Sequence, residues 1–426
     1  MTQERTTLSR RSFVKAAATG ASLAALSGSV SLTAAQQTRV LGANERIRIA
    51  QIGCGSRGIG AHMKSIQPHL KTLNADFVGV CDPWRVAREA ANAKVKEWCG
   101  HEAKMTPSYQ ELLAMKDLDA VCIASCDHQH EAHLEAAAKA GKHVYVEKPM
   151  AKRMDKLISA VDAVKAAGVC VQVGTNMRSV PFNVGTREFF RSGLLGKPSR
   201  LEQCRNAERP YWYGYVKPVK KEDVDWKEFL MDAPQREFDP VRYSGWYGYR
   251  DYSDGPVPGL ASHFVDLMHF ITGATFPSSC VCLGGTYTWK DDNKFDCPDH
   301  VEALWTYPEG FMMAYSTDFG NGSGSRIRMA CEKGTINMDG VWSEATCTPL
   351  GGPKRDGKIR GEKKIPAVQC ADHWQDWLQC IRSGKQPVAP IDAGYQHSVA
   401  NIMAVMAYDS GKRMIYDPAK REIREG

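Results

Sequence analysis

The chain has 426 residues, of which 43% are hydrophobic and 24% are charged. This composition excludes a disordered or fibrous protein, and the length is enough for two domains with cores of their own. Of the formal net charge of +7, residues 1–39 carry +4, because they hold five Lys or Arg residues against one acidic residue. The remainder carries only +3, which gives no indication of a nucleic-acid partner.

The first forty residues have the pattern of an export signal. Arg10 and Arg11 are followed by Phe13, Lys15 and a run of small apolar residues to about Ala35. This order is typical of a twin-arginine signal, and Ser, Thr and Gly make the run too polar for a comfortable membrane span. A short anchor or a chance Arg pair is the alternative. We expect residues 1–38 to be a signal peptide read by the twin-arginine export machinery, and the protein to be periplasmic or otherwise exported.

Fourteen cysteines are many for an exported protein, but no two have CxxC spacing. Several lie in apolar, strand-like runs, where a protein that folds in the reducing cytoplasm carries cysteine as a small core residue. We expect buried thiols, with neither a disulfide framework nor a metal site.

Strand and helix patterns alternate over the first part of the chain. Strands are expected at 47–52, 77–81, 120–124, 143–146 and 169–173, with helices from about Gly58, Pro83, Tyr109, His130 and Asp155. Such alternation predicts a doubly wound parallel sheet of the Rossmann type, at 45–174.

The pattern changes after residue 174. Longer strand-like runs at 199–206, 279–288, 300–307, 310–319, 326–331 and 334–338 predict a mainly antiparallel sheet in a second, α+β domain at 175–372. Apolar stripes at 373–383 and 395–410 predict helices, so that 373–426 packs back on the body. The fold class is therefore α/β with a second, sheet-based domain.

A GxGxxG motif, Gly53-Cys54-Gly55-Ser56-Arg57-Gly58, directly follows the first strand and opens a helix. Its glycines permit a tight turn, close approach of a pyrophosphate and close helix packing, and the helix N-terminus faces the phosphates. Asp82, which ends the second strand, would accept hydrogen bonds from ribose hydroxyls and repel a 2′-phosphate. This favours NAD over NADP, although Arg57 and Arg85 could neutralise a phosphate. The alternative is a glycine turn with a strand-end Asp that caps the next helix.

Two further motifs carry a family resemblance. Ser125-Cys126-Asp127-His128-Gln129-His130 and Val146-Glu147-Lys148-Pro149 resemble the glucose-fructose oxidoreductase, inositol dehydrogenase and rhizopine catabolism (Gfo/Idh/MocA) family, with Cys126 where proline is frequent. The resemblance runs from about Ile47 to the C-terminus and implies a homo-oligomer formed through the open face of the second sheet. It also implies that cofactor contacts come from Ser125, His128, His130, Glu147, Lys148 and Asn176.

The resemblance implies that Lys148 points its ammonium at the hydroxyl being oxidised, with Pro149 after a cis peptide that fixes the turn. A lysine partly buried beside a cationic nicotinamide should have a lowered pKa, which suits proton exchange with an alcohol. A surface lysine before a proline is the alternative.

The run 262–269 supplies the second reacting element. His263, Asp266 and His269 are three apart, so on a helix they share a face. In the family this helix brings a histidine to the substrate, usually with an aspartate four residues before it, but here that position is Gly259. This departure shifts the expected proton handling onto Lys148, His263 and Asp266. A helix with a buried histidine and a capping aspartate is the alternative.

Aromatic side chains crowd the region 209–253. Sugar rings present C–H groups to aromatic faces and hydroxyls to charged groups, so this mixture suits a carbohydrate or glycoside, although many of the rings must pack instead. The expected substrate contacts are Arg178, Tyr211, Trp212, Tyr243, Trp246, His263 and His269.

An exported enzyme meets no pool of free NAD, so the cofactor would be loaded before export and recycled in place. Three outcomes remain open: oxidation of one sugar with reduction of another, glycoside cleavage through a keto intermediate with return of the hydride, and transfer to an external electron acceptor. A sugar-binding or sensory protein without turnover is the alternative from another class, favoured by the missing acid at Gly259.

Overall fold

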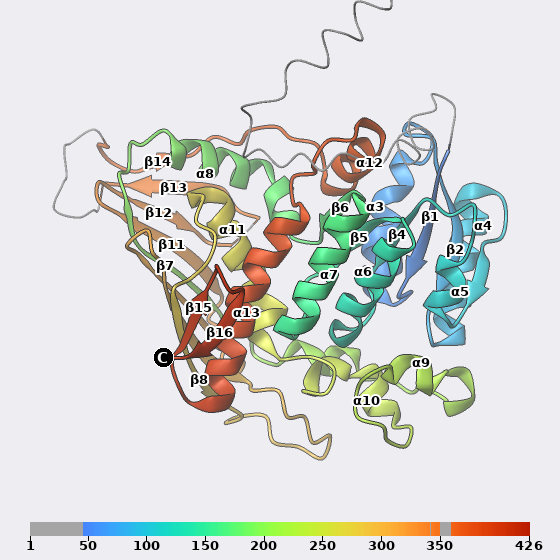
Figure 1. The fold of residues 1–426 in the computed structure, drawn as a ribbon. Helices are drawn as coiled ribbons and strands as arrows, with labels where there is room; N and C mark the ends of the chain where they lie inside the picture. The colour runs from blue at the N-terminus through green and yellow to red at the C-terminus, as the bar shows by residue number, and fades with distance from the viewer. Residues whose placement is uncertain (1–45, 341, 350–358) are drawn as a thin grey trace, which may run out of the picture. The chain divides into compact units, whose positions relative to one another are not determined.

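A computed structural model describes residues 46–340, 342–349 and 359–426, and the predicted signal segment lies outside these residues. Six strands form a parallel sheet in the order β3-β2-β1-β4-β5-β6 (Figure 1). The strands are β1 (Ile47–Ile52), β2 (Ala75–Cys81), β3 (Lys104–Thr106), β4 (Ala120–Ile123), β5 (His143–Val146) and β6 (Val171–Val173). Strands β4, β5 and β6 are buried throughout, which explains why their sequences are apolar without alternation.

Helices cover both faces of this sheet, as its doubly wound pattern predicts. On one face Ile52 shares a core with Leu134 of α6 (His130–Lys139) and Leu157 of α7 (Met154–Ala167). On the other face Ile49 shares a core with Val95 of α4 (Arg85–Cys99). The same core includes Trp377 of α12 (His373–Ser383), so a helix from the end of the chain completes the covering of the first sheet. The shorter elements are η1 (Gly58–Met63), α3 (Lys64–Ile66), η2 (Gln67–His69), α5 (Tyr109–Leu113) and η3 (Asp127–Gln129).

The second sheet has ten strands in the order β14-β13-β12-β11-β7-β10-β9-β8-β15-β16. All neighbours are antiparallel except β7 and β10, which confirms the mainly antiparallel sheet. The strands are β7 (Pro198–Arg205), β8 (Ser279–Gly285), β9 (His300–Thr306), β10 (Met312–Asp318), β11 (Ser325–Cys331), β12 (Thr335–Met338), β13 (Ala345–Thr348), β14 (Lys363–Lys364), β15 (Met414–Asp417) and β16 (Glu422–Glu425).

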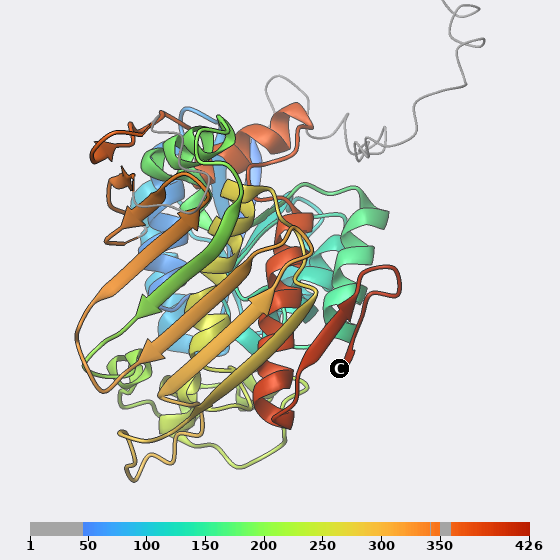
Figure 2. The same cartoon turned by 90° about the vertical axis from the view of Figure 1, so that its left-hand side faces the viewer.

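Helices pack on one face of the second sheet. Trp305 of β9 donates a hydrogen bond to the Ala400 carbonyl of α13 (Ile391–Ser410) at 2.9 Å. Helices α8 (Pro181–Arg191) and α11 (Ser262–Thr272) contribute to the same core. In Figure 2 the second sheet lies in front of these helices and turns its other face toward the viewer. The first sheet ends at Val173 and the second begins at Pro198, on either side of the expected boundary, while the described residues from 46 onward belong to one compact unit.

Residues 209–253, which we call the crossing segment, connect β7 to the region before α11. They contain η5 (Tyr211–Tyr215), η6 (Lys221–Asp223), α9 (Trp226–Leu230), α10 (Pro240–Ser244) and η7 (Trp246–Gly248), followed by η8 (Val257–Ala261). Helices α9 and α10 lie beside the first sheet's part of the molecule, not beside the second sheet (Figure 1). Their aromatic side chains form a small core of their own, against which Cys126 of the first domain packs.

All fourteen cysteines lie among the described residues and none forms a disulfide. Nine are buried, in agreement with the expected core thiols, whereas Cys370 is exposed. Within the described ranges, no helix has the length and apolar character needed to cross a membrane.

Candidate active site

A cavity of about 640 Å³ lies where the carboxyl ends of the first sheet's strands meet the crossing segment and the second sheet. Ligands of doubly wound folds bind at this edge, because the strand-to-helix turns and helix N-termini gather there. One end of the cavity is lined by Gly53, Gly55 and Asp82, and the other by Lys148 and His263.

The glycine motif has the geometry that a dinucleotide requires. Gly53 has φ +83°, and a Cβ there would meet the Ala124 carbonyl carbon at 2.4 Å. A Cβ on Gly58 would lie 1.9 Å from the Gly53 carbonyl oxygen, so only glycine allows the helix to pack this closely. Gly55, by contrast, has nothing within 4 Å of its Cβ position and faces the cavity. The open space lies where a pyrophosphate would approach the backbone.

Asp82 is held in place at the same end. Its carboxylate accepts hydrogen bonds from the backbone N–H of Cys54 at 2.7 Å and of Trp84 at 2.8 Å. The Tyr243 hydroxyl, from the crossing segment, donates to it at 3.4 Å. Burial raises the pKa of Asp82, and the two backbone hydrogen bonds act in the opposite direction. The position fits the ribose of a bound dinucleotide, and the negative charge disfavours a 2′-phosphate.

Glu147 anchors the strand end next to the reacting residues. Its Oε1 lies 2.6 Å from Arg57 Nε and 2.9 Å from His62 Nε2. Although burial raises its pKa, the charge of Arg57 and the hydrogen bond from His62 outweigh that effect and hold the pKa well below the usual range. Glu147 is therefore an ionised, fully paired support that ties the glycine-motif helix to the end of β5.

Lys148 lines the cavity and its peptide bond to Pro149 is cis, as the family resemblance implied. The Nζ atom donates a hydrogen bond to the Gly259 carbonyl at 2.6 Å. Burial lowers the pKa of Lys148, whereas the negative charges of Glu147 and Asp127 raise it. A partly buried ammonium with a lowered pKa is suited to exchange a proton with a substrate hydroxyl.

Two buried polar atoms near Lys148 have no hydrogen-bond partner among the described residues. They are Nδ1 of His263, on the first turn of α11, and the hydroxyl of Tyr211, on η5. Both residues line the cavity. Burial lowers the pKa of His263 well below its usual value and the charge of Lys148 lowers it further, while burial raises that of Tyr211. A neutral imidazole and a protonated phenol therefore face a common space, and buried polar atoms of this kind indicate a missing hydrogen-bonding ligand.

Asp266 and His269 do not line the cavity, although the sequence placed them with His263. Asp266 is fully buried and forms a bidentate pair with Arg178, whose Nε and Nη2 each lie 2.8 Å from a carboxylate oxygen. His269 Nε2 lies 2.7 Å from the Tyr307 hydroxyl. Arg178, expected to contact substrate, is buried with Asp266. These contacts tie α11 to η4 (Asn176–Ser179) and to the second sheet, which is a supporting arrangement.

The remaining predicted residues divide into two groups. Those that line the cavity are Ser56, Arg57, Ser125, His130, Glu147, Tyr243 and Trp246. Those that do not are Gly58, His128, Asn176 and Trp212. His128 is partly buried and its Nε2 lies 2.9 Å from the Phe229 carbonyl oxygen, and Trp212 packs against Phe319 with ring centroids 5.5 Å apart. Both positions hold the crossing segment against its surroundings.

Several cavity residues received no role from the sequence, and the charged ones among them include Asp127, Arg205 and Lys217. Asp127 lies inside a motif that was recognised, so its place in that motif was the available signal. Burial raises its pKa to about 6, and the Ser253 hydroxyl donates a hydrogen bond to it at 2.9 Å. Arg205 ends a strand of the other domain, and no local pattern connects it with the first domain.

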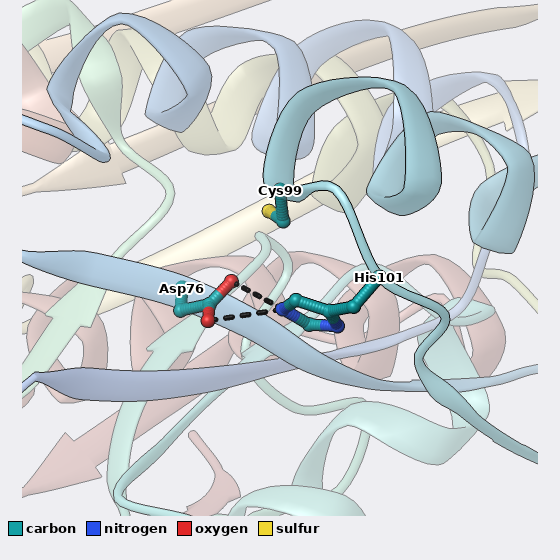
Figure 3. Close-up of side chains that lie close together, drawn as sticks. All are labelled: Asp76, Cys99 and His101. Carbon is teal, nitrogen blue, oxygen red and sulfur yellow. Dashed lines mark hydrogen bonds and ion pairs between the residues drawn. The ribbon is translucent and has the colours of Figure 1, made fainter.

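A second group of potential ligands lies away from the cavity. Asp76 on β2, Cys99 at the end of α4 and His101 just after it have donor atoms within 4.8 Å of one another (Figure 3). His101 Nε2 is 3.0 Å from both carboxylate oxygens of Asp76, and Arg46 Nη1 is 3.0 Å from one of them. The carboxylate is already neutralised by these partners, so we assign no ion to the group.

Comparison with known families agrees with this architecture. A model described as "Oxidoreductase family, NAD-binding Rossmann fold" matches residues 47–175, and a model described as "GFO/IDH/MocA C-terminal domain" matches residues 228–337. Together they cover more than half of the chain. The chain belongs to the Gfo/Idh/MocA family.

Curated relatives of this Gfo/Idh/MocA protein match it over part of their length. The oxidoreductase YrbE of Bacillus subtilis is 28% identical over 45% of this chain and 52% of its own. An inositol 2-dehydrogenase/D-chiro-inositol 3-dehydrogenase of Shouchella clausii is 33% identical over 38% of this chain and 45% of its own. The 1,5-anhydro-D-fructose reductase of Ensifer adhaerens is 26% identical over 37% and 51%. The chain thus spans about half the length of the curated relatives it matches.

Solved structures show the same fold at low identity. An aldose-aldose oxidoreductase from Caulobacter crescentus, complexed with glycerol, matches with a TM-score of 0.65 and 18% identity, over 87% of this chain and 100% of its own. The WlbA dehydrogenase from Bordetella pertussis, in complex with NADH and UDP-GlcNAcA, matches with a TM-score of 0.65 and 20% identity, over 88% of this chain and 99% of its own. Levoglucosan dehydrogenase in complex with NADH matches with a TM-score of 0.66 and 14% identity, over 87% of this chain and 98% of its own.

Proposed function

We propose that this Gfo/Idh/MocA protein is an exported oxidoreductase that transfers a hydride between a CH–OH group of a carbohydrate and a bound nicotinamide that it retains, NAD in preference to NADP. One observation carries the proposal. A single cavity joins the glycine motif and Asp82 at one end to Lys148 and the unpartnered atoms of His263 and Tyr211 at the other.

The chain's own groups can perform the proton transfers. Bound NAD would accept or return a hydride at the nicotinamide. Lys148, in its deprotonated form, can take the proton of a ring hydroxyl as the hydride leaves, and the neutral His263 imidazole can accept or hold a proton next to it. Tyr211, whose raised pKa keeps it protonated, can donate a hydrogen bond to the substrate.

The crossing segment supports retention of the cofactor, because it closes over the adenosine end of the cavity. The Asp225 N–H donates to the Pro83 carbonyl at 2.9 Å. Arg85 pairs with Asp223 at 2.6 Å, and the Tyr243 hydroxyl donates to Asp82. A cofactor bound beneath these contacts leaves only after they break. Slow release is therefore the property that this segment would confer.

Retention favours a reaction without net oxidation, in which the hydride taken from one sugar carbon is returned in the same catalytic cycle. The return can go to a second sugar, or to the same ring after the keto group has acidified the neighbouring C–H and allowed elimination of a glycosidic group and addition of water. The names of the relatives, which act on inositol, anhydrofructose and levoglucosan, support a cyclic polyol or sugar substrate. Cavity rings such as Tyr211, Trp246 and Tyr247 suit the C–H faces of such rings.

The test begins with the protein as purified after export. Denaturation should release NAD or NADH in near-equal amount to protein, with little NADP. Mixing the native holoprotein with a panel of sugars and glycosides should then change the absorbance of the reduced nicotinamide. A protein that releases nicotinamide but shows no absorbance change with any sugar that binds would be a sugar-binding protein, and the oxidoreductase proposal would be rejected.

A further inference from the structure

The reacting end of the cavity holds a cation without a counter-charge. Arg205, the last residue of β7, lines the cavity together with Ser325, its partner in β11. Among the described residues, no hydrogen bond or ion pair involves its guanidinium. Its charge acts on both Lys148 and His263, which places it near the reacting groups. Arg209, a second cavity cation, lies over the rings of Tyr213 and Trp289, and no acidic partner is present in the described part of the chain.

The acids near this end do not balance these cations. Glu147 is already paired with Arg57 and His62. Asp127 is buried, and its pKa of about 6 means that a larger fraction of it is protonated near neutral pH than of an exposed carboxylate. Position 259, whose carbonyl accepts the Lys148 hydrogen bond, is a glycine and adds no acid. The Tyr211 hydroxyl, a neutral group, takes up the space that a side chain there would need.

We propose that the carbohydrate substrate carries an acidic group, a carboxylate or a sulfate or phosphate ester, which Arg205 binds through its guanidinium. The inference rests on the proposed function, because it concerns the substrate of the same site. An arginine at the edge of a desolvated cavity can hold an oxyanion with two parallel hydrogen bonds. Gly259 and the neutral hydroxyl of Tyr211 beside it add no negative charge that would repel such a substrate.

Equilibrium binding tests the inference without relying on turnover. The holoprotein is titrated by calorimetry with glucuronate, galacturonate and mannuronate, each paired with its neutral methyl ester, and with glucose 6-sulfate and glucose 6-phosphate beside glucose. We expect at least one acid to bind about tenfold or more tightly than its neutral counterpart, with the difference shrinking as salt is added. The uronates and the esters distinguish a carboxylate from a sulfate or phosphate as the acidic group.

Arg205→Met should remove this preference, so that the acid binds no more tightly than its neutral counterpart, and Arg205→Lys should restore part of it. Arg326→Met is the matched control, because Arg326 lies next to Ser325 in β11 but borders the opposite face of the sheet. Equal binding of acids and esters, no binding by any member of the panel, or a preference that survives Arg205→Met would overturn the inference. If neutral sugars alone reduce the bound nicotinamide, the proposed function stands and the inference fails. If acids bind through Arg205 without any hydride transfer, the inference stands and the proposed function fails.

Discussion

The Tyr211 hydroxyl occupies the space into which a side chain at Gly259 would extend, since a Cβ built on Gly259 would lie 2.4 Å from that oxygen. The Gly259 carbonyl in turn accepts the hydrogen bond of Lys148. Position 259 therefore contributes a backbone acceptor and no carboxylate, and the phenol of Tyr211 provides the polar group beside it.

This relationship predicts a coupling between the two positions. Gly259→Ala should lower the free energy of unfolding by about 1–3 kcal/mol, because the Tyr211 ring is packed by Trp212 and Tyr247 and cannot retreat. With Tyr211→Phe the nearest atom becomes the ring carbon at 3.4 Å, so the double variant should recover most of the loss. Urea unfolding of the four proteins measures the cycle. An equal cost of Gly259→Ala in both backgrounds would contradict the packing argument.

Lys148→Met should reduce turnover by about 10²–10⁴-fold while the purified protein still contains its nicotinamide, because the lysine exchanges a proton and does not hold the cofactor's phosphates. Lys142→Met is the control. Lys142 is buried, and its Nζ donates a hydrogen bond to the Leu118 carbonyl at 2.8 Å, away from the cavity. Loss of activity accompanied by loss of nicotinamide would instead assign Lys148 to cofactor binding.

The pH dependence of oxidation should respond to Asp127. The negative charge of Asp127 raises the pKa of Lys148, against the lowering caused by burial. Asp127→Asn should therefore lower the pKa of Lys148 further and move the acidic limb of the kcat/KM profile, along which the rate rises as Lys148 loses its proton, to lower pH. Below about pH 6 the native Asp127 is itself protonated, so the effect of this charge should disappear there. A limb that stays in place, or moves to higher pH, would count against this electrostatic coupling.

Retention of the cofactor should depend on the core of the crossing segment. Phe229 is 2% exposed, and its ring contacts those of Tyr243 and Tyr252. Phe229→Ala should speed the release of bound nicotinamide by at least about tenfold, as followed by its capture with an NAD-consuming enzyme. Phe311→Ala, at a 4% exposed position in the core of the second sheet, should destabilise the protein by a similar ~3–5 kcal/mol without faster release. Equally fast release from both variants would show that loss of overall stability, and not the core of the crossing segment, controls release of the nicotinamide.

The buried pair of Arg178 and Asp266 should matter for stability more than for chemistry. Arg178→Met leaves the Asp266 carboxylate buried without its partner, which should cost about 3–5 kcal/mol of unfolding free energy. Arg178→Met combined with Asp266→Leu should recover much of this loss, with turnover of the folded protein near normal. A catalytic Asp266 would give the opposite pattern, in which Asp266→Asn abolishes turnover at nearly unchanged stability.

Local patterns determined much of the fold. The strands of the first sheet are short apolar runs between turn residues, and their burial on both faces makes them recognisable without knowledge of neighbours. The strands missed were β3, β13, β14, β15 and β16, which are short and lie at or near the sheet edges. Residues at such positions are half exposed, as the two exposed lysines of β14 illustrate, so hydrophobic periodicity is weak there.

The candidate site likewise has parts that local sequence predicts and parts that it does not. The sequence by itself determined the parts that depend on neighbouring residues, namely the glycine turn at Gly53 and Asp82 at the next strand end. The cis proline after Lys148 was implied only by the family resemblance of that motif. Helical spacing alone could not separate His263 from His269. Steps of three residues each fall ~60° short of a turn, so the two histidines point ~120° apart and only the first reaches the cavity.

Only the tertiary structure decided which distant groups meet. Arg178 pairs with Asp266 across 88 residues, Tyr211 fills the space at Gly259, and Arg205 reaches the cavity from a strand of the second sheet. Such contacts depend on how the crossing segment and the second sheet pack against the first domain. That packing buries apolar surface contributed by the whole chain, so no short stretch of sequence contains the information that sets it.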